Sequence, residues 1–176
     1  SMPILGEPAP DFEAVTTQGL VKLSDFKGKW LVMFSHPADF TPVCTTEFMA
    51  FAAIADELKA LNVQLMGLSI DSVPSHLAWI RSIKEKMGVD IGFPIIADLD
   101  MKVAKKFGMI HTGQSSTAAV RAVFFIDEKG ILRAMIYYPL SSGRYMPEII
   151  RLVKSLQATD KYGVSTPANW QPGDKV

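Results

Sequence analysis

The residue with the clearest chemical potential is Cys44, the single cysteine of a 176-residue chain. It lies in residues 34–47, where an apolar strand-like run ends and a helical pattern begins. Thr41 and Pro42 predict the helix start, because a capping residue is followed by proline at the first helical position. A cysteine just inside such a start can form a reactive thiolate. We expect the Thr41 hydroxyl to lie near the Cys44 amide and its sulfur.

A helix start alone would leave this thiol weakly nucleophilic. A free thiol, with a pKa of about 8.5, is only a few per cent ionised at neutral pH. Moving the pKa of a thiol to roughly 6 takes about 3.4 kcal/mol, at about 1.36 kcal/mol per pH unit. A helix N-terminus supplies at most about 2 kcal/mol of this. The difference predicts a cation close to Cys44.

Arg121 is the first candidate for that cation, because it interrupts the apolar run Ala-Ala-Val-Arg-Ala-Val-Phe-Phe-Ile. A buried guanidinium needs an anionic partner, and a Cys44 thiolate together with Glu47 would supply one. Arg144, in the loop sequence Ser-Ser-Gly-Arg, is a second candidate. Two alternatives stay open on the residues alone. A lone cysteine in a helix is often an inert, buried apolar residue, and Arg121 could face solvent at a sheet edge.

The composition excludes several classes of function. The formal net charge is zero and no basic run occurs, which argues against nucleic acid as a partner. No apolar run reaches the roughly 18 residues of a membrane span, and no signal-peptide pattern is present. One cysteine fits a reducing cytoplasm. The three histidines do not show metal-ligand spacing, so no metal or other cofactor is expected; they are His36, His76 and His111.

Periodicity predicts an α/β chain. Apolar and alternating runs predict strands at residues 12–16, 20–23, 30–35, 63–70, 93–97, 119–126 and 131–138. Three- and four-residue spacings predict helices at residues 41–62, 74–87, 99–107 and 145–157. This order predicts a thioredoxin-like fold, a central mixed β-sheet flanked by helices. We expect one domain over residues 1–159 and the polar start of a C-terminal arm over residues 160–176.

The stretch Pro37-Ala-Asp-Phe-Thr-Pro-Val-Cys44 matches the Pro-x-x-x-Thr-x-x-Cys motif of peroxiredoxins. The longer string Phe-Ser-His-Pro-x-Asp-Phe-Thr-Pro-Val-Cys-Thr-Thr-Glu resembles their one-cysteine subfamily in particular. Further matching stretches lie at residues 68–73, 76–79, 93–98, 120–124, 138–144 and 166–174. The resemblance therefore covers nearly the whole chain.

This resemblance implies a thiol peroxidase that reduces hydrogen peroxide and organic hydroperoxides, in antioxidant defence and redox homeostasis. Cys44 would attack the terminal peroxide oxygen and become a sulfenic acid. Thr41 would hydrogen-bond the sulfur or the peroxide, and Pro37 would shield the sulfur. Arg121 would favour the thiolate and stabilise charge on the reacting oxygens. The matching positions that would support this site are His36, Glu47 and Arg144.

The resemblance also implies partners and leaves alternatives. We expect an external thiol reductant of the glutathione or thioredoxin type, and a homodimer or higher oligomer. A peroxide sensor or holdase-like chaperone using the same cysteine is the alternative function, and a module with an inert thiol is a third. The Gly-x-Ser-x-Gly string of phospholipase-active relatives is absent and Ser24 stands at its histidine position, so that activity is not expected. The family's C-terminal arm, where a resolving cysteine could lie, is expected to be mostly missing.

Overall fold

The computed structural model describes residues 2–176 and divides into two compact units, one ending at Arg144 and one spanning Tyr145–Val176. The first unit is built on a seven-stranded mixed sheet with the strand order β2-β1-β5-β4-β3-β6-β7. Its strands are β1 (Glu13–Thr16), β2 (Gly19–Lys22), β3 (Trp30–Ser35), β4 (Val63–Ser69), β5 (Ile95–Ala97), β6 (Arg121–Ile126) and β7 (Leu132–Tyr138).

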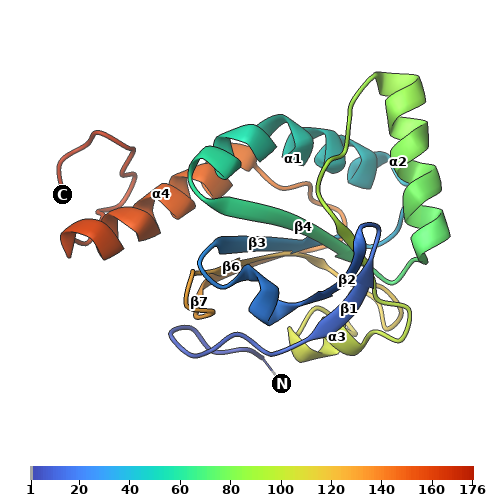
Figure 1. The fold of residues 1–176 in the computed structure, drawn as a ribbon, viewed down its shortest axis with the longest axis horizontal. Helices are drawn as coiled ribbons and strands as arrows, with labels where there is room; N and C mark the ends of the chain where they lie inside the picture. The colour runs from blue at the N-terminus through green and yellow to red at the C-terminus, as the bar shows by residue number, and fades with distance from the viewer. Residues whose placement is uncertain (1) are drawn as a thin grey trace. The chain divides into compact units, whose positions relative to one another are not determined.

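The helices of this unit lie on both sides of the sheet, with α1 and α2 on one side and α3 on the other (Figure 1). They are α1 (Pro42–Ala60), α2 (Val73–Met87), α3 (Lys102–Lys106) and the short 3-10 helix η1 (Leu23–Phe26). The predicted α/β class, a central mixed sheet flanked by helices, is confirmed. None of the helices formed by residues 2–176 has the length and apolar character needed to cross a membrane.

Strand β3 lies inside the sheet, between β4 and β6, and all six of its residues are buried. It pairs in parallel with β4 and antiparallel with β6. Because successive side chains of a strand point to opposite faces, β3 contributes to two cores. Leu31 and Met33 join the cluster that contains Phe107. Phe34 stacks on Phe51 of α1 on the other face, with ring centroids 3.7 Å apart.

Helix α1 packs very close to the sheet at Gly67 of β4. A Cβ atom at Gly67 would lie 3.2 Å from the Phe48 ring and 3.3 Å from the Phe34 ring. Glycine therefore allows α1 to approach the strands, and this close packing sets the distance between the start of α1 and the sheet.

Two predicted helix boundaries are wrong, each because of a local contact. The helix expected over residues 99–107 is shorter, since Met101 adopts a left-handed backbone and the Asp98 carboxylate accepts the Val103 and Ala104 amides, which delays the start. In the second unit, α4 (Met146–Tyr162) runs past residue 157. It ends at Gly163, whose left-handed backbone lets its amide bond the Thr159 carbonyl.

The second unit contains α4 and the segment that follows it. Ser155 and Thr166 share a hydroxyl–hydroxyl bond of 2.6 Å, and Arg151 donates to the Trp170 carbonyl over 3.2 Å. These bonds fold the segment back on α4. The predicted domain division after residue 159 stays a prediction.

Candidate active site

The sheet topology brings Cys44 and Arg121 together across 77 residues of sequence. Strand β3 ends at Ser35 and leads through a short loop into α1, while β6 begins at Arg121. Because β3 and β6 are antiparallel, the end of one lies beside the start of the other. Ser35 ties the two together: its hydroxyl donates to the Val120 carbonyl over 2.6 Å and accepts the Ala122 amide over 3.0 Å.

The first two turns of α1 carry functional side chains on their buried face. Cys44, Glu47, Phe48 and Phe51 are all buried and recur at spacings of three and four residues. Residues at this spacing share one side of a helix. The same face that packs two phenylalanines into the core therefore also holds a thiol and a carboxylate away from solvent, and Cys44 itself has no exposed surface.

Arg121 lies between this thiol and this carboxylate. Its Nη1 donates to Cys44 Sγ over 3.2 Å and to Glu47 Oε1 over 2.6 Å. Its Nε donates to the Leu140 carbonyl over 2.8 Å, which fixes the plane of the guanidinium. Arg121 is only 3% exposed, so the alternative of a solvent-facing arginine at a sheet edge does not hold.

Arg144 also bonds Glu47, through both oxygens of the carboxylate. Its backbone amide and Nε donate to Glu47 Oε2 over 2.8 and 2.7 Å, and its Nη2 donates to Oε1 over 2.8 Å. Its Nη1 donates to the Ala122 carbonyl over 2.7 Å. The guanidinium carbon also lies over the rings of Phe34 and Phe51, 5.5 and 5.3 Å from their centroids. Arg144 is thus immobilised by Glu47 and the core.

The charges of this cluster do not cancel. Burial alone would raise the pKa of Glu47, but hydrogen bonds and attraction from Arg144, and then from Arg121, bring that pKa below its ordinary 4.5. Burial lowers the pKa of Arg144 from 12.5, and Glu47 opposes the change. Two guanidiniums facing one carboxylate leave one net positive charge. The sulfur of Cys44 is the further acceptor that Arg121 contacts.

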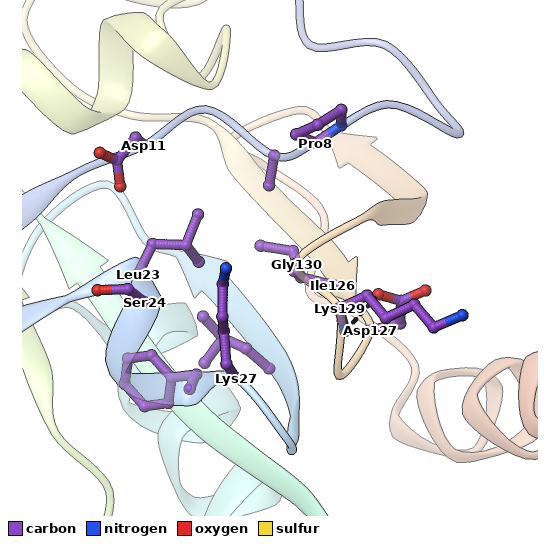
Figure 2. A pocket seen from close by; sticks show the side chains of 12 residues that line it. Pro8, Asp11, Leu23, Ser24, Lys27, Ile126, Asp127, Lys129 and Gly130 are labelled. Carbon is purple, nitrogen blue, oxygen red and sulfur yellow. Dashed lines mark hydrogen bonds between the residues drawn. The ribbon is translucent and has the colours of Figure 1, made fainter.

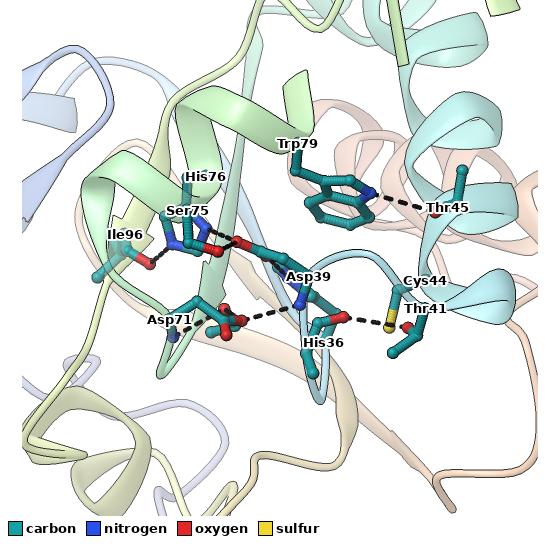
Figure 3. A network of polar contacts seen from close by, with 12 residues as sticks. His36, Asp39, Thr41, Cys44, Thr45, Asp71, Ser75, His76, Trp79 and Ile96 are labelled. Carbon is teal, nitrogen blue, oxygen red and sulfur yellow. Dashed lines mark hydrogen bonds and ion pairs between the residues drawn. The ribbon is translucent and has the colours of Figure 1, made fainter. Parts of the chain in front are cut away.

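The loop between β3 and α1 carries Pro37 and Thr41, which are both half-buried. Thr41 has the extended backbone of a capping residue, but its side chain accepts no amide of the first turn. The hydroxyl instead donates to the Ala38 carbonyl over 3.1 Å (Figure 3). The Thr41 hydroxyl therefore accepts no hydrogen bond from the Cys44 amide and is oriented toward its own loop.

A second buried polar cluster, which the sequence did not predict, centres on Asp39 in the same loop. Its Oδ1 bonds His36 Nε2 and its Oδ2 bonds His76 Nδ1, both over 2.7 Å (Figure 3). Burial would raise the pKa of Asp39, but the hydrogen bonds from His36 and His76 hold it well below its ordinary value. Burial lowers the pKa of His36 below 6.5. The His36 ring does not satisfy a backbone group, and its Nδ1 has no partner within residues 2–176.

This second cluster has the residue types of a metal site but not the spacing. Donor atoms of His36, Asp39, Asp71 and His76 lie within 4.8 Å of one another. Both Asp39 oxygens, however, are only 2.7 Å from histidine nitrogens. Ligands about 2.0–2.2 Å from a tetrahedral zinc ion are roughly 3.3 Å apart. Both separations are those of hydrogen bonds, which account for the two Asp39 oxygens.

A separate pocket of about 390 Å³ lies between the N-terminal segment, η1 and the β6–β7 turn (Figure 2). Its lining mixes apolar side chains such as Leu23 and Ile126 with charged ones such as Lys27 and Asp127. Ser24 is among the lining residues, but no histidine is. None of the seven predicted site residues lines this pocket, so it is not part of the Cys44 site.

Comparison with known proteins agrees with this arrangement. Residues 5–135 match the AhpC/TSA family, and residues 155–176 match the C-terminal domain of 1-Cys peroxiredoxin. A peroxiredoxin of Aquifex aeolicus is 66% identical over 98% of this chain and 78% of its own length. Peroxiredoxin 2 of Caldanaerobacter subterraneus is 59% identical over 99% of this chain and 79% of its own.

Solved structures show the same fold. A cysteine-to-serine mutant of peroxiredoxin 6 of Arenicola marina has a TM-score of 0.91 at 42% identity, covering 98% of this chain and 81% of its own. A yeast mitochondrial 1-Cys peroxiredoxin has a TM-score of 0.91 at 45% identity, covering 98% and 85%. The chain belongs to the AhpC/TSA family of peroxiredoxins, with a thioredoxin-like fold. It is a thiol peroxidase, an oxidoreductase that uses a peroxide as its acceptor.

Proposed function

We propose that Cys44 is the cysteine that reacts with peroxide and that Arg121 is the group that activates it. The observation that supports this most is the 3.2 Å contact between Arg121 Nη1 and Cys44 Sγ, made by a cluster with one net positive charge. Burial by itself disfavours a thiolate, but the attraction between the thiolate and an uncompensated cation is stronger in a low local dielectric than in water. The helix start adds its smaller contribution.

In the proposed reaction the Cys44 thiolate attacks the terminal oxygen of a hydroperoxide. A sulfur–oxygen bond forms as the oxygen–oxygen bond breaks, and the sulfur is oxidised by two electrons to a sulfenic acid. The leaving oxygen takes the proton that the thiol gave up and departs as water or an alcohol. Arg121 stabilises the charge on the two oxygens while the bond breaks, an electrostatic role that needs no movement of the guanidinium.

The other predicted residues take supporting roles in this proposal. Glu47 and Arg144 hold Arg121 in position, and removing Glu47 would leave two buried guanidiniums without a carboxylate. Pro37 and Thr41 line the approach to the sulfur, and His36 anchors their loop through Asp39. Because Cys44 has no exposed surface, this loop must move for a peroxide to reach the sulfur.

We further propose that an external thiol regenerates Cys44. The sulfenic acid would condense with one thiol to a mixed disulfide and water, and a second thiol would release the cysteine. The yeast mitochondrial 1-Cys peroxiredoxin is resolved through glutathione and thioredoxin systems, which supports a reductant of that type. A single cysteine in the chain supports a reducing, cytoplasmic location, which tagging the protein in cells would test.

A homodimer is the proposed assembly. The sheet order ends at β7, whose outer edge is bonded by Gly6 and Glu7 at Leu132 and has no neighbouring strand along residues 133–138 among residues 2–176. An exposed strand edge is a template for pairing with another chain. Sedimentation at several concentrations tests this, with a dimer or a larger closed assembly expected and a monomer at all concentrations contradicting it.

Stopped-flow peroxide reduction tests the central assignment. Wild-type protein should consume many equivalents of peroxide when a thiol reductant is present, and the Cys44→Ser variant should consume none. Retained turnover in Cys44→Ser would exclude Cys44 as the reacting residue. Consumption of a single equivalent by the wild type would favour the peroxide sensor.

A further inference from the structure

Asp39 is the most heavily bonded side chain of the loop that lies over Cys44. Besides the two histidine bonds, its Oδ2 accepts the Ser75 hydroxyl over 2.8 Å (Figure 3). Its backbone amide donates to Asp71 Oδ2 over 2.9 Å. Ser75 and His76 belong to α2, so Asp39 connects the active-site loop to a different helix. The Asp39 side chain is almost completely buried, which makes the loss of these bonds strongly unfavourable.

The bonds of His76 define where the protons are. Its Nδ1 faces the Asp39 carboxylate over 2.7 Å and its Nε2 faces the Ile96 carbonyl over 2.9 Å. An ionised carboxylate and a carbonyl can only accept, so both ring nitrogens of His76 must donate. His76 therefore carries a positive charge that balances Asp39. His36 needs only one proton, on Nε2, since its Nδ1 has no partner in the described chain.

The residue after Asp39 explains why the loop needs an anchor. Phe40 has a φ of 61°, the left-handed region that is unfavourable for a residue with a bulky side chain. Phe40 is more exposed than buried, so its own packing contributes little to holding this shape. Thr41 and the first turn of α1 follow directly. The bonds of Asp39, together with the Thr41–Ala38 bond that spans Phe40, are thus the interactions nearest to Phe40 that hold the chain in this conformation.

We propose that Asp39, held by His76, is a positioning residue for the peroxidase reaction. The Asp39–His76 ion pair fixes the loop that carries Pro37 and Thr41 and thereby sets the geometry at Cys44, without contacting the sulfur. This inference rests on the proposed role of Cys44. It differs from the role of Arg121, since a balanced ion pair contributes no net charge to the thiolate.

The double variant Asp39→Asn/His76→Gln separates position from charge, because it removes both charges together. We expect kcat/KM for peroxide to fall about 10- to 100-fold, as a misplacement of about 1 Å can cause. The pH midpoint of Cys44 alkylation should stay within about 0.3 of the wild-type value, a change of only about twofold. The matched control is His111→Gln, since His111 bonds the Gly108 carbonyl away from this cluster. An unchanged rate, or a midpoint shift that accounts for the whole loss, would overturn the proposal.

A measurement on the wild-type protein keeps the inference testable if the double variant does not fold. Nitrogen NMR of ¹⁵N-histidine-labelled, reduced protein with a chelator present should show both ring nitrogens of His76 protonated at neutral pH. His36 should show one protonated and one bare nitrogen, with signals assigned through His36→Gln and His111→Gln. A bare nitrogen on His76 would overturn the proposal. This readout does not depend on the reactivity of Cys44, so it is distinct from a failure of the proposed function.

Discussion

Two buried polar clusters flank Cys44, and they differ in charge balance. One joins Arg121, Arg144 and Glu47 and keeps one net positive charge against the sulfur. The other joins Asp39 to His36 and His76, and its Asp39–His76 ion pair is balanced, with the half-buried Asp71 beside it. Both are nearly inaccessible to water, so electrostatic interactions are strong in each.

The difference indicates a division of labour around the thiol. An unbalanced cluster can stabilise an anion that appears during the reaction, and the guanidinium group is always charged. A balanced cluster adds nothing to that stabilisation, but it can hold a loop in an otherwise unfavourable shape. Reactivity at Cys44 then depends on charge from β6 and on geometry from the Asp39 loop, and variants can separate the two.

The largest expected effect comes from neutralising Glu47, the carboxylate that lies between Arg121 and Arg144. Glu47→Gln leaves two buried guanidiniums without a carboxylate and should lower the free energy of unfolding by about 3–5 kcal/mol. Urea unfolding followed by circular dichroism measures this. Glu85→Gln, at an exposed position of α2, is the matched control and should change the free energy by less than about 0.5 kcal/mol. A loss of that small size in Glu47→Gln would mean that the arginines do not depend on Glu47.

Changing the shape of the cation without removing its charge is the next test. Arg121→Lys cannot place donors at both the Nε and the Nη1 positions, because the three N–H groups of a lysine share one nitrogen. We expect kcat/KM for peroxide to fall about 10²- to 10³-fold, the usual loss when one preorganised donor is removed. Arg81→Lys, on the exposed side of α2, is the stopped-flow control. Equal rates for both variants would remove Arg121 from the mechanism.

The two clusters should also differ in the pH range over which they lose stability. The pKa of His36 is lowered below 6.5, so the unfolded chain binds more protons and stability falls as pH drops below about 6.5. The pKa of Glu47 is lowered below 4.5, so its contribution is lost only as pH falls further. We expect His36→Gln to flatten the unfolding profile between neutral pH and about pH 5, by the order of 1 kcal/mol. A profile parallel to the wild type in that range would contradict a neutral, buried His36.

The smallest expected effect is at Phe40, the residue with the left-handed backbone that follows Asp39. Asparagine tolerates the left-handed conformation of Phe40 better than alanine does. Phe40→Asn should therefore be about 0.5–1 kcal/mol more stable than Phe40→Ala in urea unfolding. Comparing the two variants removes the common loss of the phenyl ring. Equal stabilities would mean that no strain is stored at this position.

The sequence predicted those site residues whose polarity did not match the residues around them. Arg121 was such a residue, because it is a charge inside an apolar strand. Its need for an anionic partner matched the need of Cys44 for a cation and pointed to Glu47 as well. Asp39 and His76 gave no such signal, because Asp39 lies in a polar loop and His76 lies on a helix with many polar residues. Their partnership spans 37 residues and needs the tertiary structure to appear.

The strands and helices were likewise predicted where the sequence pattern alone decides them. Continuous apolar runs predicted the central strands to within a residue or two, since burial on both faces leaves an unmistakable pattern. The start of α3 and the end of α4 were missed because single contacts decide them, the Asp98 carboxylate at one and Gly163 at the other. The Thr41 hydroxyl likewise makes a local bond that its capping position did not predict, to the Ala38 carbonyl.

The most direct test of the account is the pH titration of the Cys44 thiolate, followed by its ultraviolet absorbance, in wild-type protein and in Arg121→Gln. This substitution removes the unbalanced charge and leaves Glu47 bonded to Arg144. The account predicts a higher midpoint in the variant than in the wild type, because the contact between the guanidinium and the sulfur is lost. An unchanged midpoint in a folded variant would contradict it.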